Sequence, residues 1–380
     1  MAAAAPRRFA GHLPALDGVR GLAILAVLLF HFVAQTTSTN SFERVVNKVL
    51  NYGSLGVDLF FVLSGFLITG ILYDSRSSPH YFRNFYMRRV LRIFPLYYLV
   101  LAVVFLVLPL VPALRDTHIV SLREHQWWAW LYGVNIYLSI KGEWALSYIE
   151  HFWSLAVEEH FYFVWPLVVW LLAARPRALL KVAILVAVAS FAARVLASAA
   201  GVSEVTTTVL TPFQLDALCL GGLFAVWLRQ PGGEEGVRRA LFPLAVGASV
   251  VAGLTYAVHI FVDAGRTISV PVRGGAFRVL FAVLVAWVLF APATSIASRF
   301  FRSRAMTTLG KYSYGLYVYH HFFSYFAMRH GTEFALAGIV GSHTLAVWLQ
   351  ALIGIALSMG VAWASYEWFE KRFLDLKRYW

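Results

Sequence analysis

The sequence is poor in charge and has almost no cysteine, and each shortage excludes a class of protein. Only 13% of the 380 residues are charged, against about 25% in an ordinary soluble domain, which is too few to cover a soluble surface of this size. The single cysteine, Cys219, excludes an intramolecular disulfide and a cysteine-based zinc site. The net charge of +13 lies in short basic clusters between apolar blocks, so we expect no nucleic-acid partner.

Hydrophobic residues, in contrast, make up 60% of the chain and fall into blocks of about 20, the length that crosses about 30 Å of hydrocarbon as a helix. No segment shows the alternating pattern of a barrel strand, so helices remain as the way to satisfy the backbone in lipid. The pattern predicts an all-α, polytopic bundle of about ten transmembrane helices in contact with membrane lipid. The expected spans are 14–36, 54–73, 92–112, 152–173, 180–199, 209–228, 241–261, 277–294, 309–328 and 345–366.

Lys and Arg are distributed unevenly between the connecting segments. If the N-terminus lies inside, the inner segments hold 21 of them and the outer segments hold 9. Inner segments of membrane proteins are the basic ones, so the count predicts that both termini lie on the inner side. The apolar stretch 126–140 is short and opens with three tryptophans, which favours an interfacial or re-entrant piece over an eleventh span.

The chain shows no long Pro- or Ser-rich linker and no repeat of fixed period. We therefore interpret 1–380 as a single membrane domain, with a core of about 14–373 and no appended soluble domain. The basic N-terminal arm is not followed by a small-residue cleavage site, so the first helix is expected to be a retained anchor. A homo-oligomer is left open.

Ionisable residues at membrane depth are costly and indicate function. Arg20 and His31 lie in LDGVRGLAILAVLLFHF, about three helical turns and about 16 Å apart on one face. Arg suits a phosphate or carboxylate, and His is suited to take a proton near neutral pH. The alternative is a snorkelling Arg and a His that bonds a neighbouring helix.

Two further segments carry polar residues near the membrane. In GVDLFFVLSGFLITG, Asp58 is a candidate to orient His31 or an ordinary helix N-terminal carboxylate, and Ser64-Gly65 interrupts the apolar run. In FYMRRVLRIFPLYYL, Arg89 and Arg92 lie one turn apart on one face. They are either a positive-inside anchor or a site for phosphates.

The span HFWSLAVEEHFYFVWPL contains Glu158 and Glu159, two adjacent acids that are hard to explain as surface residues. They point about 100° apart, so one of them at most needs to face a given cavity. The ninth span contains four tyrosines before His320 and His321. These residues form either an outer interfacial belt or the wall of a sugar-sized cavity.

Six motifs in order resemble the acyltransferase-3 family of integral membrane O-acyltransferases, and they cover about Leu16 to Phe373. The motifs are LDGVRGLAILAVLLFHF, GVDLFFVLSGFLITG, RRVLRIFPLYY, FWSLAVEEHFYFVWP, YSYGLYVYHH and YEWFEKRF. The resemblance implies transfer of an acyl group, most often acetyl, from cytoplasmic acyl-CoA to a hydroxyl. The implied acceptor is a sugar in a cell-surface glycan or glycolipid at the bacterial inner membrane, and no metal is expected.

The resemblance also assigns roles by motif. The expected catalytic residues are His31, Arg20, Glu158, Glu159 and Asp58; the residues expected to bind the acyl-CoA are Arg89, Arg92, Ser64, Gly65 and Phe66; and those expected to bind the acceptor are Trp153, Tyr317 and His320. Two positions depart from the family pattern: His160 stands where Gln is common, and Arg372 stands where Pro is usual.

The expected mechanism has His31 as a general base, worth about 10²–10⁴-fold in rate, with Asp58, Glu158 or Glu159 orienting its imidazole. Direct transfer is preferred over an acyl-histidine intermediate. Two other functions remain: the same chemistry on a small diffusible acceptor such as an antibiotic, and a proton-coupled transporter that uses His31 and the two glutamates as a relay. The absence of an inverted repeat weighs against the transporter.

Overall fold

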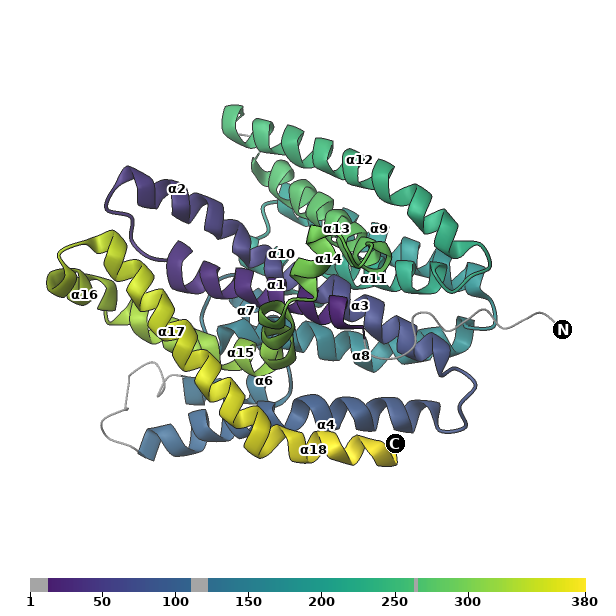
Figure 1. Cartoon of the computed structure of the whole chain (residues 1–380), viewed down its shortest axis with the longest axis horizontal. Helices are drawn as coiled ribbons and strands as arrows, with labels where there is room; N and C mark the ends of the chain where they lie inside the picture. Colours follow the sequence, from purple (N-terminus) through teal and green to yellow (C-terminus); the bar gives the residue numbers. More distant parts are fainter. Residues whose placement is uncertain (1–12, 111–121, 263–265) are drawn as a thin grey trace.

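The computed structural model describes residues 13–110, 122–262 and 266–380, and within these ranges the chain is helical with no β-strand. The long helices are α1 (Pro14–Leu29), α3 (Gly56–Asp74), α4 (Tyr81–Ala102), α8 (Trp153–Leu172), α9 (Pro176–Ala199), α11 (Leu215–Trp227), α12 (Gly233–Phe261), α13 (Arg266–Phe290), α15 (Arg304–Arg329) and α17 (His343–Ser365). The short helices are α2 (Ser41–Leu50), α6 (Gln126–Trp130), α7 (Val134–Lys141), α10 (Glu204–Val209), α14 (Ile296–Phe301), α16 (Thr332–Val340) and α18 (Lys371–Asp375). The predicted all-α bundle is confirmed (Figure 1).

Each of the ten expected spans falls on one of the ten long helices. Eight segments of the described chain are long and apolar enough to cross a membrane. The two long helices outside that set are α11 and α15. With 13 residues, α11 reaches only about 20 Å as a helix. The 26 residues of α15 include the tyrosines and histidines noted above, which lower its hydropathy.

Several helices begin earlier than expected, because polar residues in their first turns mask them in the sequence. α4, α12 and α13 start at Tyr81, Gly233 and Arg266, ahead of the expected 92, 241 and 277. The segment 126–140 forms α6 and α7, which have 5 and 8 residues and are both too short to cross a bilayer. The expectations for the N-terminal arm, and for 111–121 at the end of the third span and in the following loop, lie outside the described residues.

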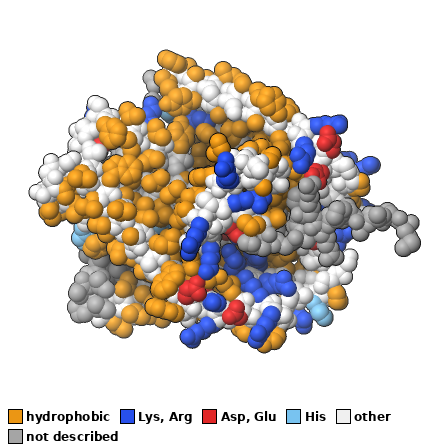
Figure 2. All heavy atoms as spheres, in the orientation of Figure 1, with side chains coloured by type: hydrophobic (Ala, Val, Ile, Leu, Met, Phe, Trp, Pro, Cys, Tyr) orange, Lys and Arg blue, Asp and Glu red, His pale blue; other side chains and the backbone are white. Residues whose placement is uncertain are grey.

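The surface separates into an apolar belt and a charged end. Hydrophobic side chains cover the left and upper parts of the face in Figure 2, and Lys and Arg gather toward the centre and right. Phe242 on α12 and Leu352 on α17 are 78% and 66% exposed, as expected for side chains that face lipid.

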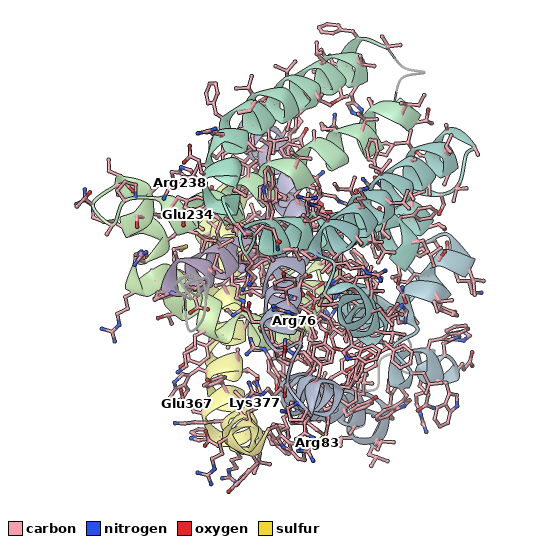
Figure 3. The ribbon with its side chains drawn as sticks, turned by 90° about the vertical axis from the view of Figure 1, so that its right-hand side faces the viewer. Arg76, Arg83, Glu234, Arg238, Glu367 and Lys377 are labelled. Carbon is pink, nitrogen blue, oxygen red and sulfur yellow. The ribbon has the colours of Figure 1, made fainter. Side chains whose placement is uncertain are left out.

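The charged end collects segments that are far apart in the sequence. Arg76, Arg238 and Lys377 all lie on the end that faces the viewer in Figure 3. They belong to three of the segments that were predicted to be inner. The basic segments therefore share one end of the bundle, and the assignment of that end to the inner side of the membrane stays a prediction.

Glycines bring four central helices into close contact. A Cβ on Gly21 of α1 would lie 2.1 Å from the Met306 carbonyl oxygen of α15, and one on Gly65 of α3 would lie 1.9 Å from the Leu218 carbonyl oxygen of α11. Such backbone approach is how membrane helices pack through small residues. The helix α3 runs unbroken through Ser64-Gly65: the pair interrupts the apolar run of the sequence but not the helix, and Gly65 packs against a neighbouring helix.

Candidate active site

A cavity of about 550 Å³ lies between α1, α3, α4, α8 and α15. Its lining extends along α3 from Ser75 to Val57, which is about 27 Å of helix. The end near Ser75 is lined by the ion pair of Arg229 and Asp74, whose closest atoms are 2.8 Å apart. We call the end near Val57 the far end; Ser154 and Tyr317 line it. The cavity is thus a long pocket that enters from the charged end of the bundle.

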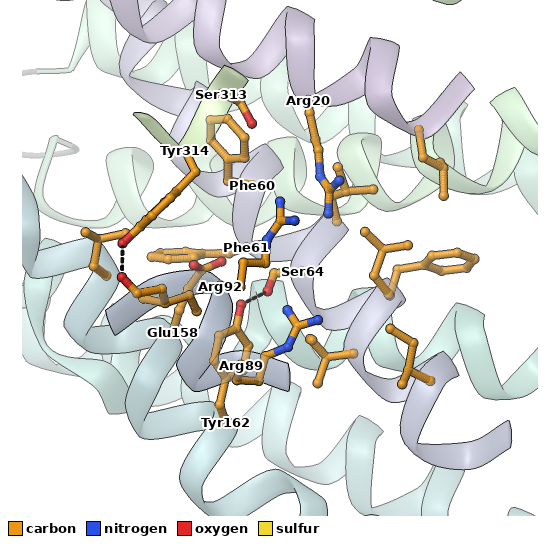
Figure 4. Close-up of a pocket in the computed structure, with 18 of the residues that line it drawn as sticks. Arg20, Phe60, Phe61, Ser64, Arg89, Arg92, Glu158, Tyr162, Ser313 and Tyr314 are labelled. Atoms are coloured by element: carbon orange, nitrogen blue, oxygen red, sulfur yellow. Dashed lines mark hydrogen bonds between the residues drawn. The ribbon is translucent and has the colours of Figure 1, made fainter. Parts of the chain in front are cut away.

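Three arginines converge in this pocket. Arg20 from α1 and Arg89 and Arg92 from α4 point their guanidinium groups toward one another (Figure 4). Arg20 Nη1 is 3.3 Å from Asp17 Oδ1. In the described chain, Arg89 and Arg92 make no ion pair within 4 Å, and Arg89 Nε is buried without a hydrogen-bond partner. Like charges held together in a buried site indicate a site for an anionic ligand.

The wall facing the arginines comes from α8 and α3. Glu158 and Tyr162 of α8 line it beside Ser64, whose Oγ is 2.5 Å from Tyr162 Oη (Figure 4). Glu159 also lines the pocket, and its Oε1 is buried without a hydrogen-bond partner among the described residues. The structure therefore brings both glutamates to the arginines predicted to bind the donor.

His31 lies beyond this pocket, in a group of four histidines that we call the histidine quartet: His31, His151, His320 and His321. The ring of His31 is 4.9 Å from that of His320 and 5.0 Å from that of His321. His151 completes the quartet, with its ring 5.4 Å and 4.7 Å from those of His320 and His321. His31 lies in a single π-helical turn, Phe30–Ala34, and such turns are frequent at functional sites.

Hydrogen bonds assign the protons in the quartet. His31 Nδ1 lies 3.0 Å from the carbonyl oxygen of Val27, which only accepts, so Nδ1 carries the proton and Nε2 carries the lone pair. His320 Nδ1 likewise donates to Tyr317 O at 2.7 Å, and its Nε2 lies 3.3 Å from His31 Nδ1. His31 is thus held in the tautomer that a general base needs, with its partly exposed ring free at Nε2.

No carboxylate takes the place behind His31 that was expected for Asp58, Glu158 or Glu159; the described partners of its Nδ1 are Val27 O and His320 Nε2. The acid that does reach the quartet is Glu150, whose Oε1 lies 3.9 Å from His321 Nε2. Glu150 escaped notice because it precedes the apolar run of α8 and resembles an ordinary interfacial residue.

Asp58 instead belongs to a buried ionic network between α3, α9, α11 and α13. Arg278 Nε donates to Asp58 Oδ1 at 2.6 Å and the same guanidinium contacts Asp216 and Gln214. Arg194 Nη2 donates to Asp216 Oδ2 at 2.8 Å. Two arginines and two aspartates therefore balance one another, as buried charges must to be tolerated.

The remaining candidate site residues lie in the pocket, in the histidine quartet or against neighbouring helices. Ser64, Phe66 and Tyr317 line the pocket, whereas Gly65 faces α11. His320 is fully buried in the quartet, and Trp153 is buried against Phe61 with ring centroids 5.9 Å apart.

Of the two positions that depart from the family pattern, His160 lies with its Nδ1 2.8 Å from Thr211 Oγ1, and Arg372 is exposed. In the described ranges, no group of three or more His, Cys, Asp and Glu residues is arranged to hold a metal ion.

Sequence comparisons identify the family. A model of the acyltransferase-3 family, described as an acyltransferase domain, matches residues 13–367. The O-acetyltransferase OatA of Staphylococcus aureus (strain NCTC 8325 / PS 47) is 26% identical over 321 residues, which are 82% of this chain and 50% of that protein. The peptidoglycan O-acetyltransferase OatA of Listeria monocytogenes is 33% identical over 184 residues, which are 46% of this chain and 27% of that protein.

The chain thus spans about half the length of the first of these relatives. No solved structure matches it. Because the matching family consists of acyltransferases, the chain is an enzyme and not the proton-coupled transporter considered above. The match includes Arg20, His31, the arginines of α4 and the glutamates of α8, and the chain belongs to the acyltransferase-3 family of membrane acyltransferases.

Proposed function

We propose that the protein is an O-acetyltransferase of the cell membrane that moves an acetyl group from cytoplasmic acetyl-CoA to a hydroxyl group of a cell-surface glycan. The observation that carries the proposal is the pair of adjoining sites: a long pocket in which Arg89 and Arg92 make no ion pair with any described residue, and a histidine quartet just beyond its far end. The name of the Listeria monocytogenes relative makes peptidoglycan the first acceptor to test.

The pocket suits acyl-CoA in charge and shape. Arg89 and Arg92 offer donors to phosphate oxygens, and Arg20 adds a third guanidinium. A CoA held there by its phosphates would extend its acyl-bearing arm along α3 toward Tyr317 and the quartet. The proposal places the charged end of the bundle on the cytoplasmic side, where the Lys and Arg count also puts it.

The quartet suits the acceptor. In the proposed reaction, His31 Nε2 removes the hydroxyl proton while the acceptor oxygen attacks the acyl carbon. The imidazolium that forms keeps its Nδ1 proton shared between Val27 O and His320 Nε2. The carbon–sulfur bond then breaks, and the proton passes to the thiolate of CoA, so the reaction needs no other proton source.

Reconstituted protein tests the proposal. In proteoliposomes, [¹⁴C]acetyl-CoA is supplied on one side of the membrane and peptidoglycan fragments on the other. The fragments should become labelled, and mass spectrometry should show one added acetyl group. A mixture of free sugars and aminoglycosides serves as the second acceptor set, and labelling of this set alone would indicate a small diffusible acceptor. No labelled product from any acceptor, with wild-type protein that binds CoA, would contradict the proposal.

A further inference from the structure

Two hydroxyl groups lie at the far end of the pocket, on the wall that separates it from the histidine quartet. Tyr317 of α15 and Ser154 of α8 both line the pocket, and both are buried. The ring of Tyr317 is 5.6 Å from that of His151 and 5.5 Å from that of His320. Tyr317 thus lines the proposed donor site and also contacts two histidines of the quartet, one of which, His320, lies against His31.

The two hydroxyl groups carry two protons between them, and one of these protons is enough to satisfy the carbonyl oxygen that both groups face. Tyr317 Oη and Ser154 Oγ are 2.6 Å apart, and both face the carbonyl oxygen of His151, at 3.0 and 3.3 Å. If one hydroxyl donates to that carbonyl, the other donates only to its neighbour hydroxyl. It can therefore turn to a ligand oxygen without leaving the buried carbonyl unsatisfied.

We infer that Tyr317 and Ser154 form the carbonyl-binding end of the donor pocket: Ser154 donates to the carbonyl oxygen of His151, and Tyr317 donates a hydrogen bond to the acyl oxygen during transfer. The inference rests on the proposed function. As the acceptor oxygen bonds to the acyl carbon, the carbonyl π electrons move to the acyl oxygen, which becomes an oxyanion. When the carbonyl re-forms, the carbon–sulfur bond breaks and its electron pair leaves with the sulfur. A donor already in place at the oxyanion lowers this barrier.

The pocket contains a second hydroxyl pair, Ser64 and Tyr162, which makes the assignment testable. That pair lies beside Arg89 and Glu158, at the charged part of the pocket (Figure 4). Among the described residues, Ser64 and Tyr162 make no ring or hydrogen-bond contact with the histidines of the quartet, so a carbonyl at that pair would lie farther from the quartet than one at Tyr317. The geometry thus favours the pair at Tyr317.

The kinetic test compares two tyrosines on one helix. Tyr317→Phe should lower kcat about 10²–10³-fold, the usual effect of losing one oxyanion donor, and change the KM for acetyl-CoA by less than about threefold. Tyr319→Phe is the control, because it removes a hydroxyl that bonds Ser365 Oγ at 3.1 Å, away from the pocket. Equal kcat in the two variants would overturn the inference, as would a loss in Tyr162→Phe but not in Tyr317→Phe.

A spectroscopic test separates the inference from the proposed function. In a His31→Ala background, where transfer is blocked, bound [1-¹³C]acetyl-CoA should show its carbonyl stretch at lower frequency than free acetyl-CoA. Adding Tyr317→Phe should return the band toward the free value, with acetyl-CoA still bound. An unchanged band would overturn the inference alone. Failure of His31→Ala to bind acetyl-CoA, with wild type also unable to bind it, would instead contradict the proposed donor site.

Discussion

Arg278 is buried and Arg89 is partly buried among apolar helices, and their hydrogen-bond partners differ. Arg278 meets Asp58, Asp216 and Gln214, so its donors have acceptors. Arg89 has a buried Nε without a hydrogen-bond partner and no ion pair in the described chain. In the first arrangement, the charge of the arginine is balanced by acids of the protein itself. The second leaves guanidinium donors of Arg89 available to a ligand, which is the arrangement expected of a functional charge rather than a structural one.

The largest expected effect concerns the base beyond the pocket. His31→Ala should lower the rate of acetyl transfer about 10²–10⁴-fold, because the acceptor proton then has no base to receive it. The binding of acetyl-CoA should stay within about twofold, since His31 does not line the pocket. The rate is measured with [¹⁴C]acetyl-CoA, with His330→Ala at the exposed end of α15 as the control. Full activity of His31→Ala would remove the mechanism.

Substitutions in the buried ionic network around Asp216 should lower the stability of the protein. Asp216→Ala leaves Arg194 and Arg278 short of a buried partner, and we expect a loss of about 3–5 kcal/mol in the free energy of unfolding. Unfolding in mixed micelles by increasing SDS measures it. Glu235→Gln removes the exposed pair with Arg239 and should cost less than about 1 kcal/mol. A stable Asp216→Ala protein without activity would instead move this network into the catalytic machinery.

Substitutions of Arg89 and Arg92 should instead affect the binding of the donor more than the stability of the protein. Arg89→Gln with Arg92→Gln should raise the KM for acetyl-CoA about 10²-fold, because two charge-assisted contacts to phosphate are lost. The midpoint of unfolding should fall far less than in Asp216→Ala, since neither arginine makes an ion pair with a described residue. Arg238→Gln with Arg239→Gln on α12 is the matched control, and its KM should equal that of wild type. An unchanged KM in the first variant would return Arg89 and Arg92 to a membrane anchor.

The smallest effect is expected at His320. His320→Phe removes the acceptor at 3.3 Å from His31 Nδ1 and should lower kcat about tenfold, the value of one hydrogen bond. His320→Gln restores an acceptor oxygen and should recover part of the loss. The pH dependence of kcat should shift in the Phe variant and return toward wild type in the Gln variant. Equal kcat and pH profiles in both variants would show that His320 only fills space.

Periodicity and composition were enough to predict the helical class and the approximate spans, because crossing lipid requires long apolar helices. They also singled out Arg20, Arg89, Arg92 and His31, since charge at membrane depth is visible in the sequence. The partner of Asp58 was not visible: Arg278 lies 220 residues away, and periodicity does not show which helices are neighbours.

Arg20 and His31, predicted to lie about three turns apart on one helix face, lie in two adjoining regions of the structure. The chain enters a π-helical turn at Phe30, and His31 packs on two rings of α15 while Arg20 lines the pocket. The wall between them comes from two other helices: Tyr317 was among the candidates from the sequence, whereas Ser154 has no signal of its own there.

The most direct test of the account compares two acetyl donors. S-acetylpantetheine carries the same thioester as acetyl-CoA but lacks its phosphates. We predict that Arg89→Gln with Arg92→Gln lowers kcat/KM about 10²-fold for acetyl-CoA and less than about threefold for S-acetylpantetheine. Equal losses for the two donors would show that these arginines do not recognise phosphate, and would contradict the assignment of the pocket to CoA.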